Sequence, residues 1–64
     1  MLMLEREVKS HCDLSMIDQC WQRGSYVYVF PICYDAVLKR LQEKFIVTGY
    51  KMKFMIVVKG RKCT

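Results

Sequence analysis

The sequence predicts an α+β domain in the order helix, strand, helix, strand, with two helices covering one face of a small sheet. Before Gly24, apolar residues recur at helical spacing. Directly after Gly24 they alternate, as in a strand. A second helical pattern follows, and it leads to an apolar segment that ends at Val58. Residues 24–58 are therefore interpreted as a strand–helix–strand unit, preceded by an amphipathic helix over 1–23 and followed by a basic tail over 59–64.

The length and composition predict one globular domain over residues 1–64. A chain of this size buries only about 60% of the surface that its unfolded state exposes, so association with a partner would add needed stability. No apolar run approaches the roughly 20 residues of a membrane-spanning helix. The N-terminus has no apolar core of signal-peptide length, and we therefore expect a cytoplasmic protein.

The net charge of +5 is distributed unevenly along the chain. Four acids against two bases give residues 1–22 a charge of −2, whereas nine bases against two acids give residues 23–64 a charge of +7. This asymmetry predicts a polarised surface that suits nucleic acid, an acidic protein or the acidic helix of a second copy.

The first predicted helix has one apolar stripe and ends where Gly24 can supply a C-cap. The stripe consists of Leu4, Val8, Cys12, Met16 and Cys20. An alternative remains open, because Ser10 with Asp13 resembles a capping box and the helix then starts as late as Ser10. In that case MLML forms a short additional strand, so whether residues 1–9 are helix or strand stays open; the unbroken i+4 series favours the long helix.

The first predicted strand, over residues 25–30, has two different apolar faces. Val27 and Val29 suit a core beneath a helix, whereas the opposite face is large and aromatic. That face carries Tyr26, Tyr28 and Phe30. Pro31 lacks the N–H group that a ladder needs and ends the strand.

The second predicted helix starts at Ile32 and leads to a last strand over residues 50–58. Its apolar stripe is Val37, Leu38, Leu41 and Phe45. Where this helix ends within residues 45–49 stays open, because the β-branched residues there prefer extended structure, and Gly49 is the expected cap. In the strand, alternation directs one set of residues to one face and a second set to the other: Tyr50, Met52, Phe54, Ile56 and Val58 against Lys51, Lys53, Met55 and Val57.

Strand, helix and strand in so few residues predict a parallel pair joined by a right-handed crossover. Two strands alone leave both edges open, and such a sheet is marginal. We therefore predict a homo-oligomer, in which copies extend the sheet or cover its aromatic face.

Catalytic and metal-binding patterns are weak in this sequence. His11 and Cys12 are adjacent on a helix and point in different directions, so they form no dyad, and His11 is expected to be exposed. The cysteines lack metal-ligand spacing, and Cys12, Cys20 and Cys33 take the place of apolar residues as buried thiols. Redox activity of Cys63, beside Arg61 and Lys62, stays open. We predict no enzyme activity, no cofactor and no metal.

The candidate binding surface consists of aromatic residues on one strand and lysines on its neighbour. These residues are Tyr26, Tyr28, Phe30, Lys51 and Lys53. Such a face can stack bases while cations hold phosphates, or it can be buried in a protein interface, where aromatic residues are also favoured. The need to cover a small sheet favours protein–protein interaction, with nucleic-acid binding as the alternative.

Two segments also resemble a group of known proteins. W-Q-R-G-S-Y is followed by an alternating strand, and D-A-V-L-K-R-L-Q-E-K is followed by G-Y-K-M. This arrangement resembles small bacteriophage-encoded α/β accessory proteins without assigned function. The matching positions are Gly24, Tyr26, Val37, Leu41, Gly49 and Tyr50. The resemblance implies a viral accessory protein that acts by binding, to a host protein among other candidates, in the host cytoplasm; it carries over no catalytic residues.

Overall fold

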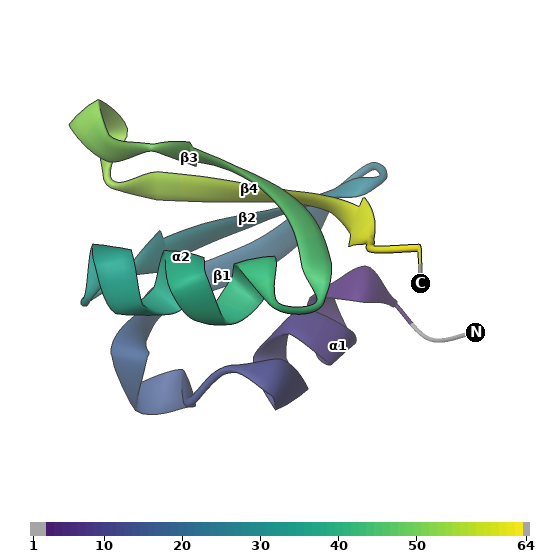
Figure 1. Ribbon diagram of the computed structural model, residues 1–64, viewed down its shortest axis with the longest axis horizontal. Coiled ribbons are helices and arrows are strands. Elements are labelled where there is room, and N and C mark those ends of the chain that lie inside the picture. Colours follow the sequence, from purple (N-terminus) through teal and green to yellow (C-terminus); the bar gives the residue numbers. More distant parts are fainter. Residues whose placement is uncertain (1–2, 64) are drawn as a thin grey trace.

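The computed structural model describes residues 3–63 and places two helices on one face of a sheet (Figure 1). In chain order the elements are α1 (Leu4–His11), the 3₁₀ turn η1 (Leu14–Met16), β1 (Ile17–Arg23), β2 (Tyr26–Pro31), α2 (Tyr34–Gln42), β3 (Phe45–Tyr50), the 3₁₀ turn η2 (Lys51–Lys53) and β4 (Met55–Arg61). The predicted α+β class, with two helices covering one face of a small sheet, is confirmed. Within the described residues, no helix is long and apolar enough to cross a membrane.

The sheet has four strands in the order β1-β2-β4-β3, and every neighbouring pair is antiparallel. The predicted parallel pair with a right-handed crossover is therefore wrong. The reason is an additional strand, β3, between α2 and the last strand. It reverses the chain once more, so β4 runs antiparallel to β2. The chain thus consists of two hairpins, each preceded by a helix.

The predicted helix over residues 1–23 is also wrong, because α1 ends at His11 and β1 follows. The side chain of Asp13 accepts a hydrogen bond from the Ser15 N–H at 3.0 Å and starts η1 there. Gly24, expected as a helix C-cap, instead lies in the turn between β1 and β2 with a φ of +62°, which suits a tight hairpin. Met1 and Leu2 of the predicted helix, and Thr64 of the predicted tail, lie outside the described residues.

The second half of the chain differs from the prediction at three places. α2 runs from Tyr34 to Gln42 rather than from Ile32, and Phe45 belongs to β3, where its side chain is fully buried. Gly49 does not cap a helix: it lies in β3 directly against Tyr34 of α2, where an added Cβ would collide with the tyrosine hydroxyl.

The predicted last strand and tail change at both ends. The expected strand over residues 50–58 is shifted, because β4 starts only at Met55 and residues 51–53 form η2. The expected tail over 59–64 is wrong for residues 59–61, which continue β4.

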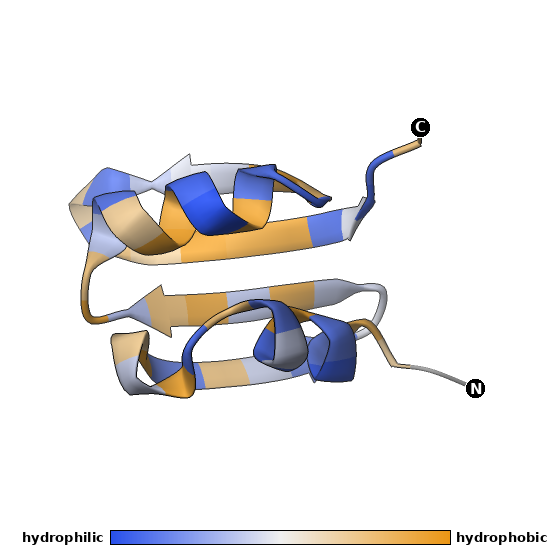
Figure 2. Ribbon diagram, turned by 60° about the horizontal axis from the view of Figure 1, so that its bottom comes forward, coloured by the Kyte–Doolittle hydropathy of each residue, from blue (hydrophilic) through white to orange (hydrophobic). Residues whose placement is uncertain are grey.

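The core lies between the sheet and the helices. Figure 2 shows the hydrophobic stretch of β4 and the hydrophilic outer sides of the helices. α1 packs against β1 and β2, whereas α2 packs mainly against β3. Among residues 3–63, eight side chains are essentially excluded from solvent: Val8, Val27, Val29, Val37, Leu41, Phe45, Ile56 and Val58. The expected inward direction of Val27, Val29, Ile56 and Val58 is confirmed.

Polar contacts tie α1 to the sheet. The Glu5 carboxylate accepts a hydrogen bond from the Gln22 N–H at 2.7 Å and from Lys9 Nζ at 3.0 Å, and the Glu5 N–H donates to Gln22 Oε1 at 3.1 Å. Glu7 forms an ion pair with Arg61 of β4. Hydrogen bonds from Lys9 and Arg61 hold the pKa values of Glu5 and Glu7 below their ordinary range.

A second contact joins the ends of the two helices. His11 Nε2 lies 3.0 Å from the carbonyl oxygen of Arg40, and Arg40 Nε donates to the carbonyl oxygen of His11 at 3.1 Å. Because a carbonyl only accepts, His11 must carry its proton on Nε2. The imidazole also packs edge-on against the ring of Phe45, with centroids 5.7 Å apart. The prediction of an exposed histidine is therefore wrong, since only 17% of its side chain is accessible.

Candidate functional site

The face of the sheet away from the helices, called the open face below, carries the second set of alternating side chains. The strand register places Trp21, Tyr28, Val57 and Thr48 in one row across all four strands. The neighbouring row on the covered face is Cys20, Val29, Ile56 and Gly49. Neither helix lies over the open face (Figure 1). Its side chains are therefore free to contact a ligand.

Three aromatic rings stack on the open face at the β1–β2 side. The Trp21 indole lies 5.2 Å from the Phe30 ring at an interplanar angle of 20°, and 6.4 Å from the Tyr28 ring at 28°. Trp21 is the direct cross-strand partner of Tyr28 and the diagonal neighbour of Phe30, which explains why the rings meet. Because 40% of Trp21 remains accessible, this aromatic stack presents a flat apolar surface to solvent.

Next to the aromatic stack, the open face is hollowed into a groove of about 380 Å³. The groove is lined by Tyr26, Tyr28, Tyr50, Lys53, Met55, Val57 and Lys59. Val57 is only 6% exposed, although it lies on the face without helices, and the tyrosines remain partly accessible. The groove thus combines apolar and aromatic surface with the ammonium groups of two lysines.

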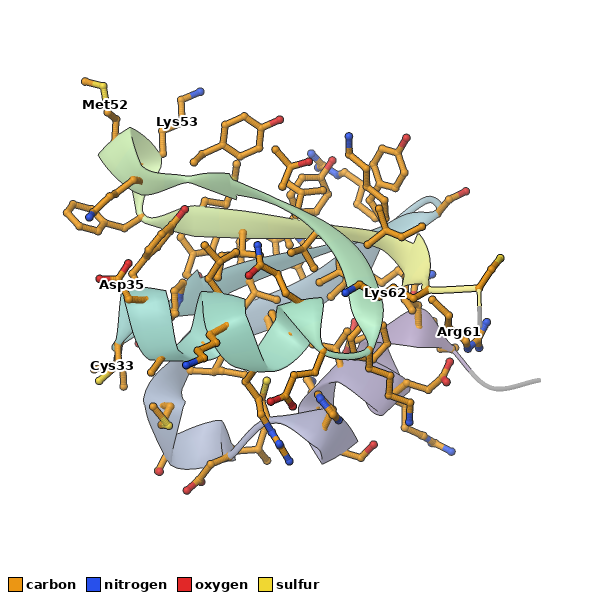
Figure 3. The ribbon with its side chains drawn as sticks, viewed as in Figure 1. Cys33, Asp35, Met52, Lys53, Arg61 and Lys62 are labelled. Atoms are coloured by element: carbon orange, nitrogen blue, oxygen red, sulfur yellow. The ribbon has the colours of Figure 1, made fainter. Side chains whose placement is uncertain are left out.

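The structure brings most of the predicted surface residues together. Tyr26, Tyr28 and Phe30 all lie in β2 on the open face. Lys51 and Lys53 lie in the turn η2 rather than on a neighbouring strand; Lys53 lines the groove, and Lys51 is exposed outside it. Figure 3 shows Lys53 projecting from this turn on the side of the sheet away from the helices.

The sequence interpretation missed three residues of the aromatic stack and the groove. Trp21 was placed in a helix, Tyr50 on the opposite face of the last strand, and Lys59 in the tail. Residues 17–23, IDQCWQR, have apolar side chains at positions 17, 20 and 21, which is no period-two pattern, so local periodicity gives no strand signal for Trp21.

Charges are segregated between the two sides of the molecule. All side-chain carboxylates except that of Asp18 belong to the helices or to the segments directly after them. Within residues 3–63, the ion pairs engage Glu5, Glu7 and Glu43. Arg23, Lys53 and Lys59 are not part of these pairs, and the residues that line the groove include no acid. The open face is therefore aromatic and basic.

The four cysteines differ in their exposure. All four are free thiols; Cys12 is buried and Cys20 half-buried, and burial raises the pKa of Cys20 to about 11. The expectation that Cys33 is buried is wrong, because it lies exposed at the start of α2 (Figure 3), and Cys63 is exposed beyond β4. No group of three or more potential metal ligands occurs among the described residues.

Comparison with protein-family models, with curated proteins and with solved structures finds no match to this chain.

Proposed function

We propose that this chain is a non-enzymatic binding protein that holds single-stranded nucleic acid on its open face. The observation that carries the proposal is the accessible aromatic stack of Trp21, Tyr28 and Phe30 beside a groove with Lys53 and Lys59. Unpaired bases stack on such rings, each contributing about 1–3 kcal/mol of binding free energy, while lysines neutralise the phosphates.

Two features favour nucleic acid over a second copy of the chain as the ligand of this face. A two-stranded sheet needs cover to be stable, but this sheet has four strands and a filled core on its helical side. In addition, two open faces in contact would gather the cations of both copies, Arg23, Lys53 and Lys59, in one interface whose groove has no acid to pair with them, which is repulsive. A polyanion with exposed bases complements both the charge and the rings.

A host protein is the second candidate ligand, because Met55 and Val57 add apolar surface to the groove and aromatic residues are frequent in protein interfaces. Both ligands agree with the resemblance to bacteriophage accessory proteins, which would place the chain in the host cytoplasm. A protein ligand would need no exposed bases, and this difference separates the two candidates in a binding experiment.

The test is a titration of the protein with short single-stranded oligonucleotides at two salt concentrations. Because Trp21 is the only tryptophan, its fluorescence reports directly on the aromatic stack, and we expect quenching when bases stack on it. Trp21→Ala should weaken binding, measured by anisotropy of a labelled oligonucleotide, by about 5- to 150-fold.

A pair of lysine variants controls for net charge. Lys59→Gln should weaken binding and reduce the slope of log K against log salt by about 0.7, the value for one phosphate contact to a single strand. Lys39→Gln makes the same charge change on the exposed surface of α2, away from the open face, and should change affinity little. Absence of salt-dependent binding, or equal losses in both variants, would contradict the proposal.

A further inference from the structure

The two edges of the sheet, β1 and β3, differ in their protection against strand pairing. At β1, the backbone N–H of Gln22 donates to the Glu5 carboxylate rather than to β2, so α1 occupies part of this edge. A bulge between Ile17 and Gln19 further interrupts β1. Side-chain caps and bulges are devices by which sheets prevent edge-to-edge association, and β1 has both.

Among residues 3–63, the opposite edge, β3, has no side-chain cap and no charge. Its pairing with β4 also shifts register between Ile46 and Val47, but the extra residue there is Lys59 of β4, so the edge strand itself stays continuous. Its sequence, FIVTGY, contains no charged residue and no proline, and three of its residues are β-branched. Within residues 3–63, the hydrogen bonds of the β3 backbone go to β4 alone. Ile46 is 51% exposed beside these free backbone groups. An uncharged strand of this kind is prone to pair with another strand.

We propose that β3 pairs with β3 of a second copy, antiparallel and about a two-fold axis, to form a continuous sheet across a dimer. The second copy fits this edge because it supplies the same extended, uncharged segment, so pairing brings no charged strand residues together despite the net charge of +5. A two-fold interface uses the same patch on both subunits and closes on itself.

The protected β1 edge then limits the assembly to two copies. Each dimer exposes only β1 at its outer edges, and there Glu5 holds the Gln22 N–H that an incoming strand would need. In an antiparallel pair related by an axis perpendicular to the sheet, both open faces lie on the same side. The dimer therefore presents two copies of the aromatic stack on one surface. The interface itself does not depend on nucleic-acid binding.

The mass of the protein in solution, without nucleic acid, tests the interface. Light scattering should give twice the chain mass of 7.7 kDa. Ile46→Lys places a charge at the β3 edge and should give a monomer with an unchanged circular dichroism spectrum. Gln19→Lys is the matched control, because Gln19 is exposed on the same face of the opposite edge, and it should remain dimeric.

A second pair of variants tests the protected edge. Glu5→Ala removes the acceptor of the Gln22 N–H and should produce masses above that of the dimer, whereas Glu5→Gln retains an acceptor oxygen and should stay dimeric. A wild-type monomer at millimolar concentration, or loss of the dimer in Gln19→Lys but not in Ile46→Lys, would overturn the interface. Loss of the dimer in Trp21→Ala would overturn it in favour of face-to-face contact, and a Glu5→Ala protein that stays dimeric would overturn the role of the cap.

Discussion

The covered and open faces of the sheet are made by alternate residues of the same four strands, yet they differ in chemistry. On the covered face, aliphatic side chains such as Val58 are excluded from solvent. On the open face, the large aromatic side chains of Trp21 and Tyr26 remain 40% and 43% exposed. The comparison places the buried core on one face and leaves the other face for the binding that we propose.

The largest expected effect comes from removing the largest buried side chain of the covered face. Phe45 is fully buried in β3 and contacts the His11 ring of α1, so Phe45→Ala leaves a cavity between sheet and helices. We expect a loss of about 3–5 kcal/mol in the free energy of unfolding, measured by urea titration. Trp21→Ala should cost much less stability. Similar losses of unfolding free energy for both variants would show that the two faces contribute equally to stability.

A matched pair of valines sharpens the comparison within one strand. Val57 and Val58 are neighbours in β4 and face opposite sides of the sheet. Val58→Ala removes contacts from a closed core and should cost about 1.5–3 kcal/mol, whereas Val57→Ala opens onto the solvent-filled groove and should cost about 1 kcal/mol or less. For oligonucleotide binding the order should be reversed, with Val57→Ala weakening the affinity more than Val58→Ala. Equal stability losses would mean that the open face is part of the core.

The smallest effect concerns the carboxylates that fix α1 on the covered side. Arg61 lowers the pKa of Glu7, and Lys9 lowers that of Glu5. A lowered folded-state pKa contributes stability above the ordinary value of 4.5, and this contribution is lost as the pH falls through the lowered values. The temperature of half-unfolding should therefore decrease modestly as the pH is lowered below 4.5.

Glu7→Gln should flatten this pH dependence. Asp35→Asn serves as its control, because Asp35 is not part of the described ion pairs, and it should leave the dependence unchanged. A Glu7→Gln protein with the same acid sensitivity as the wild type would show that the ion pair with Arg61 contributes nothing measurable.

The N-terminal half shows why the sequence could not separate helix from strand there. Cys12, Met16 and Cys20 are four residues apart, and a spacing of four fits one face of a helix and one face of a strand equally well. Val37, Leu41 and Phe45 have the same spacing across the boundary between α2 and β3. Apolar spacing therefore predicted which residues are buried more reliably than which element they belong to.

The candidate site was partly predictable for a related reason. Tyr26, Tyr28 and Phe30 alternate with two valines that must be buried, so their common face follows from the sequence alone. Strand pairing with β2 and β4 brings three further residues to this face, namely Trp21, Tyr50 and Lys59. Local periodicity does not predict which strands pair. The turn η2, which carries Lys53 to the groove, also depended on recognising β3.

The order of elements has a kinetic consequence. Each half of the chain is a helix followed by a local hairpin, and the halves share one strand pairing, between β2 and β4, which joins Val27 to Val58. Hairpins form in about 1–10 μs, whereas contacts between residues distant in sequence must first close a long loop. We therefore expect the docking of the two halves along this central pair to limit the folding rate, so that the last contacts made in folding are those at the middle of the sheet.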